Sequence, residues 1–485
     1  MRQKSITVNL ITNGIKTLMS VLFPLITFPY ASRVLGTVGI GKVNYAASII
    51  SYFALVASLG INTYAVREGA RIRDDREEFN KFAKEILNIN LCTTVISYTA
   101  LFIFLNMPVL KGYKTLLVIS SAGIVFTTIG MEWLFVIREE YTYITKRAVL
   151  FQFVSLILLF LLVRSKDDYY WYAALTVISS GGSAILNLWH SRKFVDWRKS
   201  YAYEYKRHLK PIFFIFGTSL ASSIYMTMDT TMLGAMKGDS AVGVYTAAVK
   251  INLVISTLIG TISSTILPRV SYYIGNGQKK EYENLMKSSM DILLMISVPA
   301  AVGMICTSDI LILLFSGSAF LAGTTAAKIL SAKVLVGAVN RVFAYQICTP
   351  YKKDKEVLIS TASGAVFNLI ANAVLIPTVG VTGAAIATLC SELVVFLVLA
   401  KYAKELLRIG PLFQRIPVYL AASIWFFAAR WGVHLLNVSQ TVELIITVAV
   451  SMCGYFVILL LIRDPYLHLY TKKFMGIVKK MKIKG

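Results

Sequence analysis

The sequence predicts an all-α membrane protein that crosses the bilayer about fourteen times. Three observations lead to this prediction. The 485 residues are 56% hydrophobic and only 15% charged, with a mean hydropathy of +0.66, whereas a water-soluble protein carries about 25% charged residues. Apolar stretches of spanning length recur along the whole chain, and basic residues gather on one side of them. This composition excludes a soluble enzyme of this size and an intrinsically disordered chain.

A helix needs about 20 mostly apolar residues to span the hydrocarbon core of a bilayer. The first such stretch, 6–30, is too long for the apolar segment of a signal peptide and lacks a small-residue cleavage site, so we expect it to remain as a helix. The stretch 148–163 is short, and 323–349 carries three basic residues. The expected spans are 6–30, 43–66, 86–106, 115–137, 148–163, 169–189, 211–236, 241–266, 288–307, 323–349, 357–376, 381–400, 416–434 and 442–462.

The basic residues give an independent test of this topology. Of the 49 Lys and Arg residues, 36 fall on the side of the N-terminus, 7 fall on the opposite side and 6 lie within spans. Cytoplasmic connections of membrane proteins carry such an excess of basic residues. We therefore expect both termini in the cytoplasm. The same asymmetry explains the net charge of +24 and the pI of about 9.7 without a nucleic-acid partner.

Two cytoplasmic segments combine basic and apolar residues. Residues 191–210 are basic and aromatic, and residues 471–484 alternate lysines with apolar side chains at helical spacing. We expect both to be amphipathic and to lie along the anionic inner leaflet. The alternative is a solvated basic connector and a solvated tail.

Two hairpins of the chain resemble each other. Residues 35–47 read Leu-Gly, then two further glycines, then Tyr-Ala-Ala, and residues 233–247 read Leu-Gly, two further glycines and Tyr-Thr-Ala. The Leu-Gly pairs are offset by 198 residues and the tyrosines by 200 residues, and the six spans between them give both copies one orientation. Such a parallel repeat predicts two six-helix lobes related by a pseudo-twofold axis along the membrane normal. The expected parts are an N-terminal lobe 1–190, a connector 191–210, a C-terminal lobe 211–402, two extra helices 403–463 and a basic cytoplasmic tail 464–485.

Motifs for catalysis or metal binding are weak or missing in the sequence. Residues 36–42 spell G-x-x-x-x-G-K, but Val43 stands where a P-loop needs Ser or Thr. The five cysteines and four histidines are scattered without disulfide or metal-ligand spacing. Since paired carboxylates and a Ser/His/Asp set are also missing, we expect no enzymatic activity and no cofactor.

Ionisable residues within the spans are the most informative positions. A charged side chain at the bilayer centre costs about 3 kcal/mol on insertion scales, so such residues face a polar cavity or pair with each other. Lys333, Asn340 and Arg341 share one face of a helix. Lys328 and Arg430 lie near helix ends, where they can snorkel, and Glu132 lies near the inner interface. The expected cationic cavity consists of Lys16, Lys250, Lys333, Arg341 and Asn340, with Asp229 and Glu392 as charge-balancing or coupling residues.

A cavity of net positive charge suits a strongly anionic group such as a phosphate or pyrophosphate. Asp229 and Lys250 lie at similar depth in neighbouring spans, so a direct pair is geometrically feasible. The alternative for each of these residues is a structural ion pair or a snorkelled side chain.

Residues 28–36 read Phe-Pro-Tyr-Ala-Ser-Arg-Val-Leu-Gly, and residues 58–61 read Ser-Leu-Gly-Ile ahead of Arg-Glu-Gly-Ala at 67–70. These motifs resemble bacterial polysaccharide repeat-unit flippases, a family of the multidrug/oligosaccharidyl-lipid/polysaccharide exporter superfamily. The resemblance implies translocation of an undecaprenyl-pyrophosphate-linked oligosaccharide from the inner to the outer leaflet, for O-antigen, capsule or related polymers. It also implies alternating access in the bacterial cytoplasmic membrane.

Other functions are compatible with the same sequence. A multidrug/cation antiporter of the superfamily favours acidic cavity residues, whereas a lipid II flippase would also use a cationic cavity. A membrane glycosyltransferase or polymerase usually has a large polar loop with catalytic carboxylates, which this sequence lacks. We expect a monomer that contacts membrane lipids and a polysaccharide polymerase complex and binds no nucleic acid. The coupling ion, proton or sodium, stays open.

Overall fold

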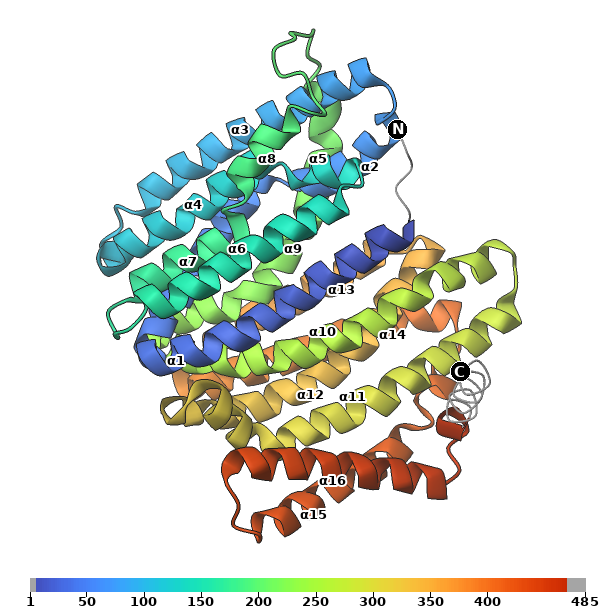
Figure 1. Cartoon of the computed structure of the whole chain (residues 1–485). Coiled ribbons are helices and arrows are strands. Elements are labelled where there is room, and N and C mark those ends of the chain that lie inside the picture. Colours follow the sequence, from blue (N-terminus) through green and yellow to red (C-terminus); the bar gives the residue numbers. More distant parts are fainter. Residues whose placement is uncertain (1–5, 469–485) are drawn as a thin grey trace, which may run out of the picture. The chain divides into compact units, whose positions relative to one another are not determined.

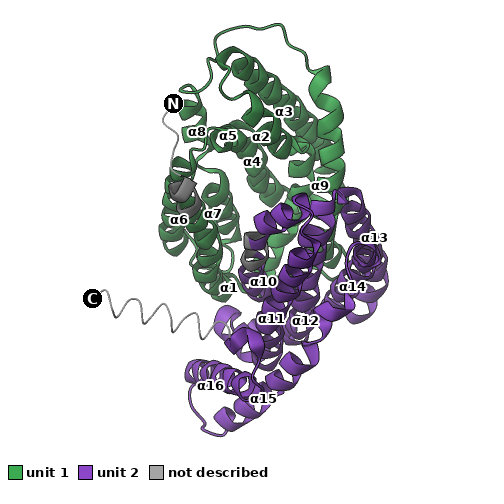
Figure 2. Ribbon diagram, turned by 90° about the vertical axis from the view of Figure 1, so that its right-hand side faces the viewer, with its two compact units in different colours: residues 1–246 green, residues 247–485 purple. Residues whose placement is uncertain are grey.

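The computed structural model of the chain describes residues 6–468, with side chains for 12–108, 110–260 and 266–468. Helices and the turns between them make up this part of the chain, which contains no strand (Figure 1). The chain divides into two compact units, residues 1–246 and 247–485 (Figure 2). This division lies inside one helix and differs from the lobes expected from the repeat, which stay a prediction.

Unit 1 is a bundle built around one long helix, α1, which packs against α3, α4, α6 and α9. Short α2 and α5 pack on each other beside the buried aromatic side chains of Phe79, Phe82 and Trp133. The helices are α1 (Ile6–Ser58), α2 (Ile61–Ile72), α3 (Arg76–Phe104), α4 (Lys114–Gly130), α5 (Glu132–Ile137), α6 (Tyr141–Leu162), α7 (Tyr169–Gly181), α8 (Ala184–Ser191), α9 (Lys206–Lys237) and the start of α10 (Asp239–Gly275).

The first two expected spans are joined without a loop, because α1 runs through both and bends sharply at Gly36. Gly36 has φ 67° and ψ −174°, a conformation that a residue with a Cβ rarely adopts. Gly238, between α9 and α10, has nearly the same values, φ 81° and ψ −176°. The repeated backbone break therefore aligns Gly36 with Gly238, an offset of 202 residues, and not with Gly234 as the Leu-Gly motif suggested.

The two breaks bring α1 and α10 into direct backbone contact. A Cβ added to Gly41 would collide with the backbone of Asp239, and a Cβ added to Gly243 would collide with the backbone of Thr37. These contacts are reciprocal, since both pairs are related by the same offset of 202 residues. The Ser240 hydroxyl donates to Thr37 Oγ1 at 2.9 Å across the crossing. The glycines are thus needed where two helices touch without side chains between them.

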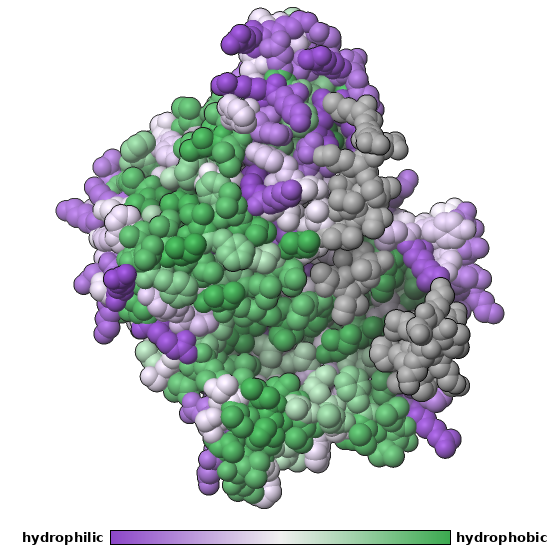
Figure 3. Space-filling model, in the orientation of Figure 1, coloured by the Kyte–Doolittle hydropathy of each residue, from purple (hydrophilic) through white to green (hydrophobic). Residues whose placement is uncertain are grey.

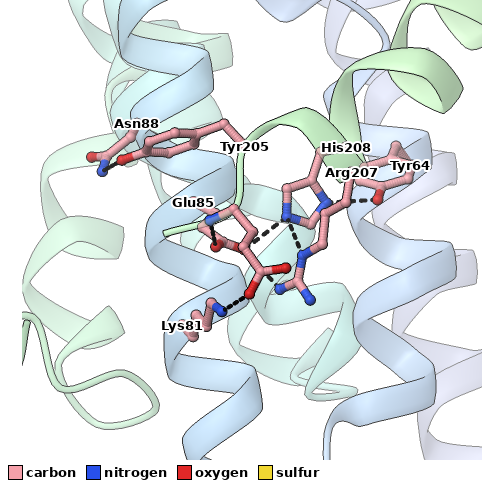
Figure 4. A network of polar contacts seen from close by, with 8 residues as sticks. Tyr64, Lys81, Glu85, Asn88, Tyr205, Arg207 and His208 are labelled. Atoms are coloured by element: carbon pink, nitrogen blue, oxygen red, sulfur yellow. Dashed lines mark hydrogen bonds and ion pairs between the residues drawn. The ribbon is translucent and has the colours of Figure 1, made fainter. Parts of the chain in front are cut away.

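The connector between α8 and α9 is not a helix. Residues 192–205 form turns and irregular backbone that lie along α3 (Figure 4), and residues 206–210 begin α9. The expected contact of 191–210 with the inner leaflet stays a prediction. The anchor of the connector is Glu85 of α3, which is fully buried. The Glu85 carboxylate accepts from the backbone N–H of Glu204 at 2.6 Å and from Arg207 at 2.8 Å, and contacts His208 Nε2 at 2.8 Å. His208 Nδ1 is in turn 2.7 Å from the Tyr64 hydroxyl.

Unit 2 packs its helices around α11, which contacts α12, α15 and α16, while α14 packs against α12 and α13. A single apolar core, with Tyr282, Phe343, Tyr419 and Tyr455 among its buried aromatic residues, joins these helices. The elements are the rest of α10, α11 (Lys279–Ser316), α12 (Thr324–Arg341), a π-helical stretch (Val342–Cys348), α13 (Asp354–Val379), α14 (Val381–Leu406), α15 (Ile416–His434) and α16 (Gln440–Leu461).

The sides of the helices are apolar where a soluble protein would be polar. Large side chains such as Phe102, Ile157, Trp189 and Leu461 are exposed, and Figure 3 shows apolar residues over the helix sides of unit 1 with hydrophilic residues at the helix ends. Exposed apolar surface of this extent indicates contact with lipid. Within the described residues, twelve helical stretches are long and apolar enough to span a membrane.

The count of fourteen spans stays a prediction. The first of the twelve stretches, Thr12–Ile72, covers two expected spans. The expected span 169–189 is divided into α7 and α8 at Gly182, which makes each piece too short to qualify alone. The amphipathic segment expected at 471–484 lies outside the described residues.

Candidate functional site

A polar cavity of unit 1 lies between α2, α4, α5, α6, α7 and α8. It has a volume of about 320 Å³, and Glu132 and Arg147 are its charged lining residues. Glu132 forms an ion pair with Lys16 of α1, and its second carboxylate oxygen is 3.7 Å from Arg147 Nη2. Two cations therefore share one carboxylate at the wall of this cavity.

Breaks in the helices place Glu132 and Arg147 at the cavity. Met131 adopts φ 41° between α4 and α5, which turns the chain so that Glu132 begins a new helix. The carbonyl of Gly130, freed by this break, accepts from Asn187 of α8 at 2.5 Å. Arg147 donates to Ser183 Oγ at 2.6 Å, at the N-terminal end of α8. Glu132 is thus placed by the start of α5, and Arg147 is held by its hydrogen bond at the start of α8.

The charge of this cluster is net positive. Lys16 and Arg147 carry two positive charges against one negative charge on Glu132, and Arg147 is only 8% exposed. Its Nε has no hydrogen-bond partner among the described residues. A planar guanidinium with an unused N–H can bind an oxyanion such as a phosphate oxygen. The surplus positive charge of the cluster can therefore attract an anionic group.

In unit 2 the structure brings together two of the residues expected from the sequence. Asn340 of α12 donates through Nδ2 to the backbone oxygen of Glu392 at 2.9 Å and to its carboxylate at 3.2 Å. Both residues are buried. Gly337 leaves room for this carboxylate, because a Cβ there would lie 2.9 Å from Glu392 Oε1. Asn340 is thus a neutral hydrogen-bond donor to Glu392, the residue expected to balance charge.

The three cations expected at the site in unit 2 have fewer fixed contacts than Asn340 and Glu392. The Arg341 side chain is exposed, and its guanidinium lies across Gly260 of α10, where a Cβ would be 2.6 Å from Nη1. Lys250 and Lys333 are half-buried. Neither forms an ion pair with a described residue of unit 2. Arg430, which lies near a helix end, is ion-paired with Asp309 at 2.7 Å, one of the two alternatives stated for the charged residues of the spans.

Asp229 lies in α9 and is buried. Its carboxylate accepts a hydrogen bond from the Tyr245 hydroxyl at 2.6 Å, within unit 1. Lys250 belongs to unit 2, so the Asp229–Lys250 pair considered from the sequence stays a prediction. So does the assignment of all seven expected site residues to substrate binding or coupling.

Glu132 and Arg147 were not expected from the sequence as site residues. The sequence places Arg147 just before the short span 148–163, where it counts as a cytoplasmic residue, but α6 begins at Tyr141 and includes it. Glu132 is 116 residues from Lys16, and nothing in the sequence links them. The available signal was the acidic residue directly after Gly-Met at 130–131, at the end of an apolar stretch.

Over the described residues, no group of three or more His, Cys, Asp and Glu side chains is placed to hold a metal ion, and all five cysteines are free. The fold and the charged clusters define a multi-pass helical membrane protein with polar sites inside its bundles, the class to which transporters belong.

Comparison with known proteins narrows this class. The chain belongs to the family described as polysaccharide biosynthesis protein, whose model matches residues 6–274. A second model, MatE, matches residues 215–374.

Named relatives in three organisms are similar to the chain. A probable low-salt glycan biosynthesis flippase of Haloferax volcanii is 25% identical over 50% of this chain and 52% of its own length. A putative O-antigen transporter of Escherichia coli K12 is 22% identical over 77% of this chain and 91% of its own. The corresponding protein of Shigella dysenteriae is 23% identical over 79% and 96%.

Solved structures share the fold. The inward closed conformation of the lipid II flippase MurJ superposes with a TM-score of 0.74, covering 94% of this chain and 99% of that one at 16% identity. An inward-facing multidrug resistance transporter of the MATE family gives a TM-score of 0.58 over 79% and 95%, at 14% identity. At these identities the likeness concerns the fold alone.

Proposed function

We propose that this protein is a flippase that moves a polyprenyl-pyrophosphate-linked oligosaccharide from the inner to the outer leaflet of the bacterial cytoplasmic membrane. The family match and the named flippases and O-antigen transporters among the relatives support the substrate class. The observation that carries the proposal in the geometry is the cluster in which Lys16 and Arg147 share Glu132 at a polar cavity. A pyrophosphate has the charge and the oxygen acceptors to compete for these cations.

The proposed mechanism is alternating access. The pyrophosphate replaces Glu132 as the partner of Lys16 and Arg147. The cations Lys333, Arg341 and Lys250 are further positions that can bind an anion. Binding must stay modest, because an ion pair that is too stable would prevent release into the outer leaflet. Release is assisted because the Glu132 carboxylate forms its ion pairs with Lys16 and Arg147 again as the pyrophosphate leaves.

The proposal includes the orientation, oligomeric state and partners that the sequence analysis predicts. Both termini lie in the cytoplasm, the protein acts as a monomer, and the exported unit feeds a polysaccharide polymerase for O-antigen, capsule or a related polymer. The protein translocates its substrate without chemical change and uses no cofactor beyond a coupling ion.

A second candidate function is flipping of lipid II, because the MurJ fold covers 94% of this chain and the same pyrophosphate chemistry would serve. The two candidate functions predict different effects on cell growth when the protein is lost. Loss of a lipid II flippase stops cell-wall synthesis, whereas loss of a repeat-unit flippase removes a surface glycan from growing cells.

The test is complementation of a strain that lacks its own repeat-unit flippase. The wild type should restore surface glycan, whereas Lys16→Ala, Lys333→Ala and Arg341→Ala should each reduce glycan display at least tenfold at normal protein abundance in the membrane. Arg71→Ala is the matched control, since Arg71 is an exposed cation paired with Glu68 and should leave display unchanged. Full display with all three variants would refute the cationic mechanism.

A further inference from the structure

Unit 2 contains a buried carboxylate that is not among the site residues expected from the sequence. Asp291 of α11 is 1% exposed. Neither of its carboxylate oxygens has a hydrogen bond of good geometry to any described residue. Buried carboxylates are otherwise hydrogen-bonded or ion-paired, because the charge loses its hydration on burial.

The groups that act on Asp291 come from three segments. They are Lys287 of α11, Arg415 directly before α15, and Asp464 and Tyr466 after α16. Lys287 is on the exposed side of α11. The Tyr466 hydroxyl approaches the carboxylate, and the buried Tyr419 hydroxyl of α15 lies in the same cluster without a hydrogen-bond partner among the described residues.

Arg415 is already engaged. Its Nη1 donates to Asp464 Oδ2 at 2.7 Å, and the Asp464 side chain has no solvent exposure. The other oxygen of Asp464 accepts from the backbone N–H groups of Tyr466 and Leu467 at 3.0 and 3.1 Å. Asp464 is therefore a fully satisfied carboxylate that fixes the turn at 464–468. Arg415 is thus paired with Asp464, and it acts on Asp291 without a hydrogen bond to that carboxylate.

We propose that Asp291 is a proton-binding site of unit 2, occupied at neutral pH. A bound proton removes the surplus negative charge and turns one oxygen of Asp291 into a donor. When the proton leaves for water, its O–H bond breaks and the electron pair stays on the carboxylate, which then competes with Asp464 for Arg415. Loss of Arg415 from Asp464 loosens the turn at 464–468, so protonation is coupled to the packing of α15 and of the end of α16 on α11.

This site deepens the proposed function, and it rests on that function only in assigning the proton to glycan translocation. A flippase needs an energy source to drive its substrate in one direction, and a proton site whose occupancy alters helix packing can supply the coupling. The site itself can be tested without any lipid substrate.

Infrared difference spectroscopy of the purified full chain in lipid nanodiscs gives the direct test. At neutral pH the wild type should show the carbonyl stretch of a protonated aspartic acid, and Asp291→Asn should lack this band. Asp309→Asn is the matched control on the same helix, because Asp309 is ion-paired with Arg430 and should leave the band in place. A wild-type spectrum without the band, or a band that survives in Asp291→Asn, would overturn the proposal.

The wild type alone provides a second measurement if Asp291→Asn does not fold. Raising the pH should remove the band and, in parallel, increase tryptic cleavage after Arg463 at the edge of the turn. Loss of the band without increased cleavage would refute the coupling to the turn. Failure of the wild type to restore glycan display, with the band present, would refute the proposed function and leave the proton site standing.

Discussion

Arg147 combines burial, charge and positional restraint. It donates to Ser183, lies near Glu132 and has the rings of Phe135 and Tyr143 within 6 Å of its guanidinium carbon, at 5.9 and 5.8 Å. A lysine could supply the charge but not the planar set of donors. The side chain is therefore expected to act through geometry as well as charge.

This distinction predicts different effects for two substitutions at position 147. Arg147→Ala should reduce glycan display about tenfold or more, equivalent to about 1.4 kcal/mol or more. Arg147→Lys should retain an intermediate level, since the charge remains while the hydrogen bond to Ser183 is lost. Display is measured by lectin binding at matched membrane abundance. Equal display for wild type and Arg147→Ala would show that the cavity cluster is only structural.

At the scale of the elements, the crossing of α1 and α10 depends on two glycines. Gly41 and Gly243 allow backbone contact at positions where any Cβ would overlap the backbone of the facing helix. Backbone atoms cannot swing aside as a flexible side chain can, so a substitution has to displace a whole helix.

Gly41→Ala and Gly243→Ala should each destabilise the protein by about 2 kcal/mol, the cost typical of overpacking a tight contact. Gly112→Ala is the control, because no atom lies within 4 Å of a Cβ added there. Thermal unfolding of the detergent-solubilised protein measures the difference. Indistinguishable unfolding temperatures for the three variants would mean that the crossing is not tightly packed.

The attachment of the connector to α3 should weaken at acid pH. The hydrogen bond from Lys81 lowers the pKa of Glu204 below its usual value of 4.5. Because the folded pKa lies below the unfolded one, the contribution of Glu204 is present above about pH 4.5 and is lost as the pH falls through the folded pKa. Amide exchange of residues 199–205, corrected for the intrinsic pH effect, should therefore accelerate only under acid conditions.

Glu204→Gln provides the comparison for this pH dependence. The variant cannot carry the charge that pairs with Lys81, so its connector should exchange faster than that of the wild type at neutral pH. It should also show little further change on acidification. A wild-type connector that exchanges at the same corrected rate throughout would argue that Glu204 does not help to hold the segment.

The sequence predicted the helical elements well because apolar length is a local property. The bend at Gly36, the break at Met131 and the interruption at Gly182 were not predicted, since each depends on packing that the local sequence does not record. Lys16 stood out as a charge in an apolar stretch, but its partner Glu132 could not be inferred across 116 residues. Asn340 and Glu392 were both expected near the site, and their mutual hydrogen bonds became visible only in the fold.

At the scale of the whole molecule, the excess of basic residues on one side predicts the orientation in the membrane. In a cysteine-free variant, Ser165→Cys, between α6 and α7, should react with a membrane-impermeant maleimide added to intact cells. Ser200→Cys, in the connector, should react only after the membrane is permeabilised. The opposite pattern would invert the topology and place the proposed entry of substrate on the wrong side.

Direct measurement of transbilayer movement tests the proposed function most sharply. Proteoliposomes would carry a polyprenyl-pyrophosphate-linked oligosaccharide in the inner leaflet only, and a lectin outside would report the fraction that reaches the outer leaflet over time. The wild type should accelerate its appearance well above the rate in protein-free liposomes, and a variant with Lys16→Ala, Lys333→Ala and Arg341→Ala combined should not. A wild-type rate equal to that of protein-free liposomes would contradict translocation of this substrate class.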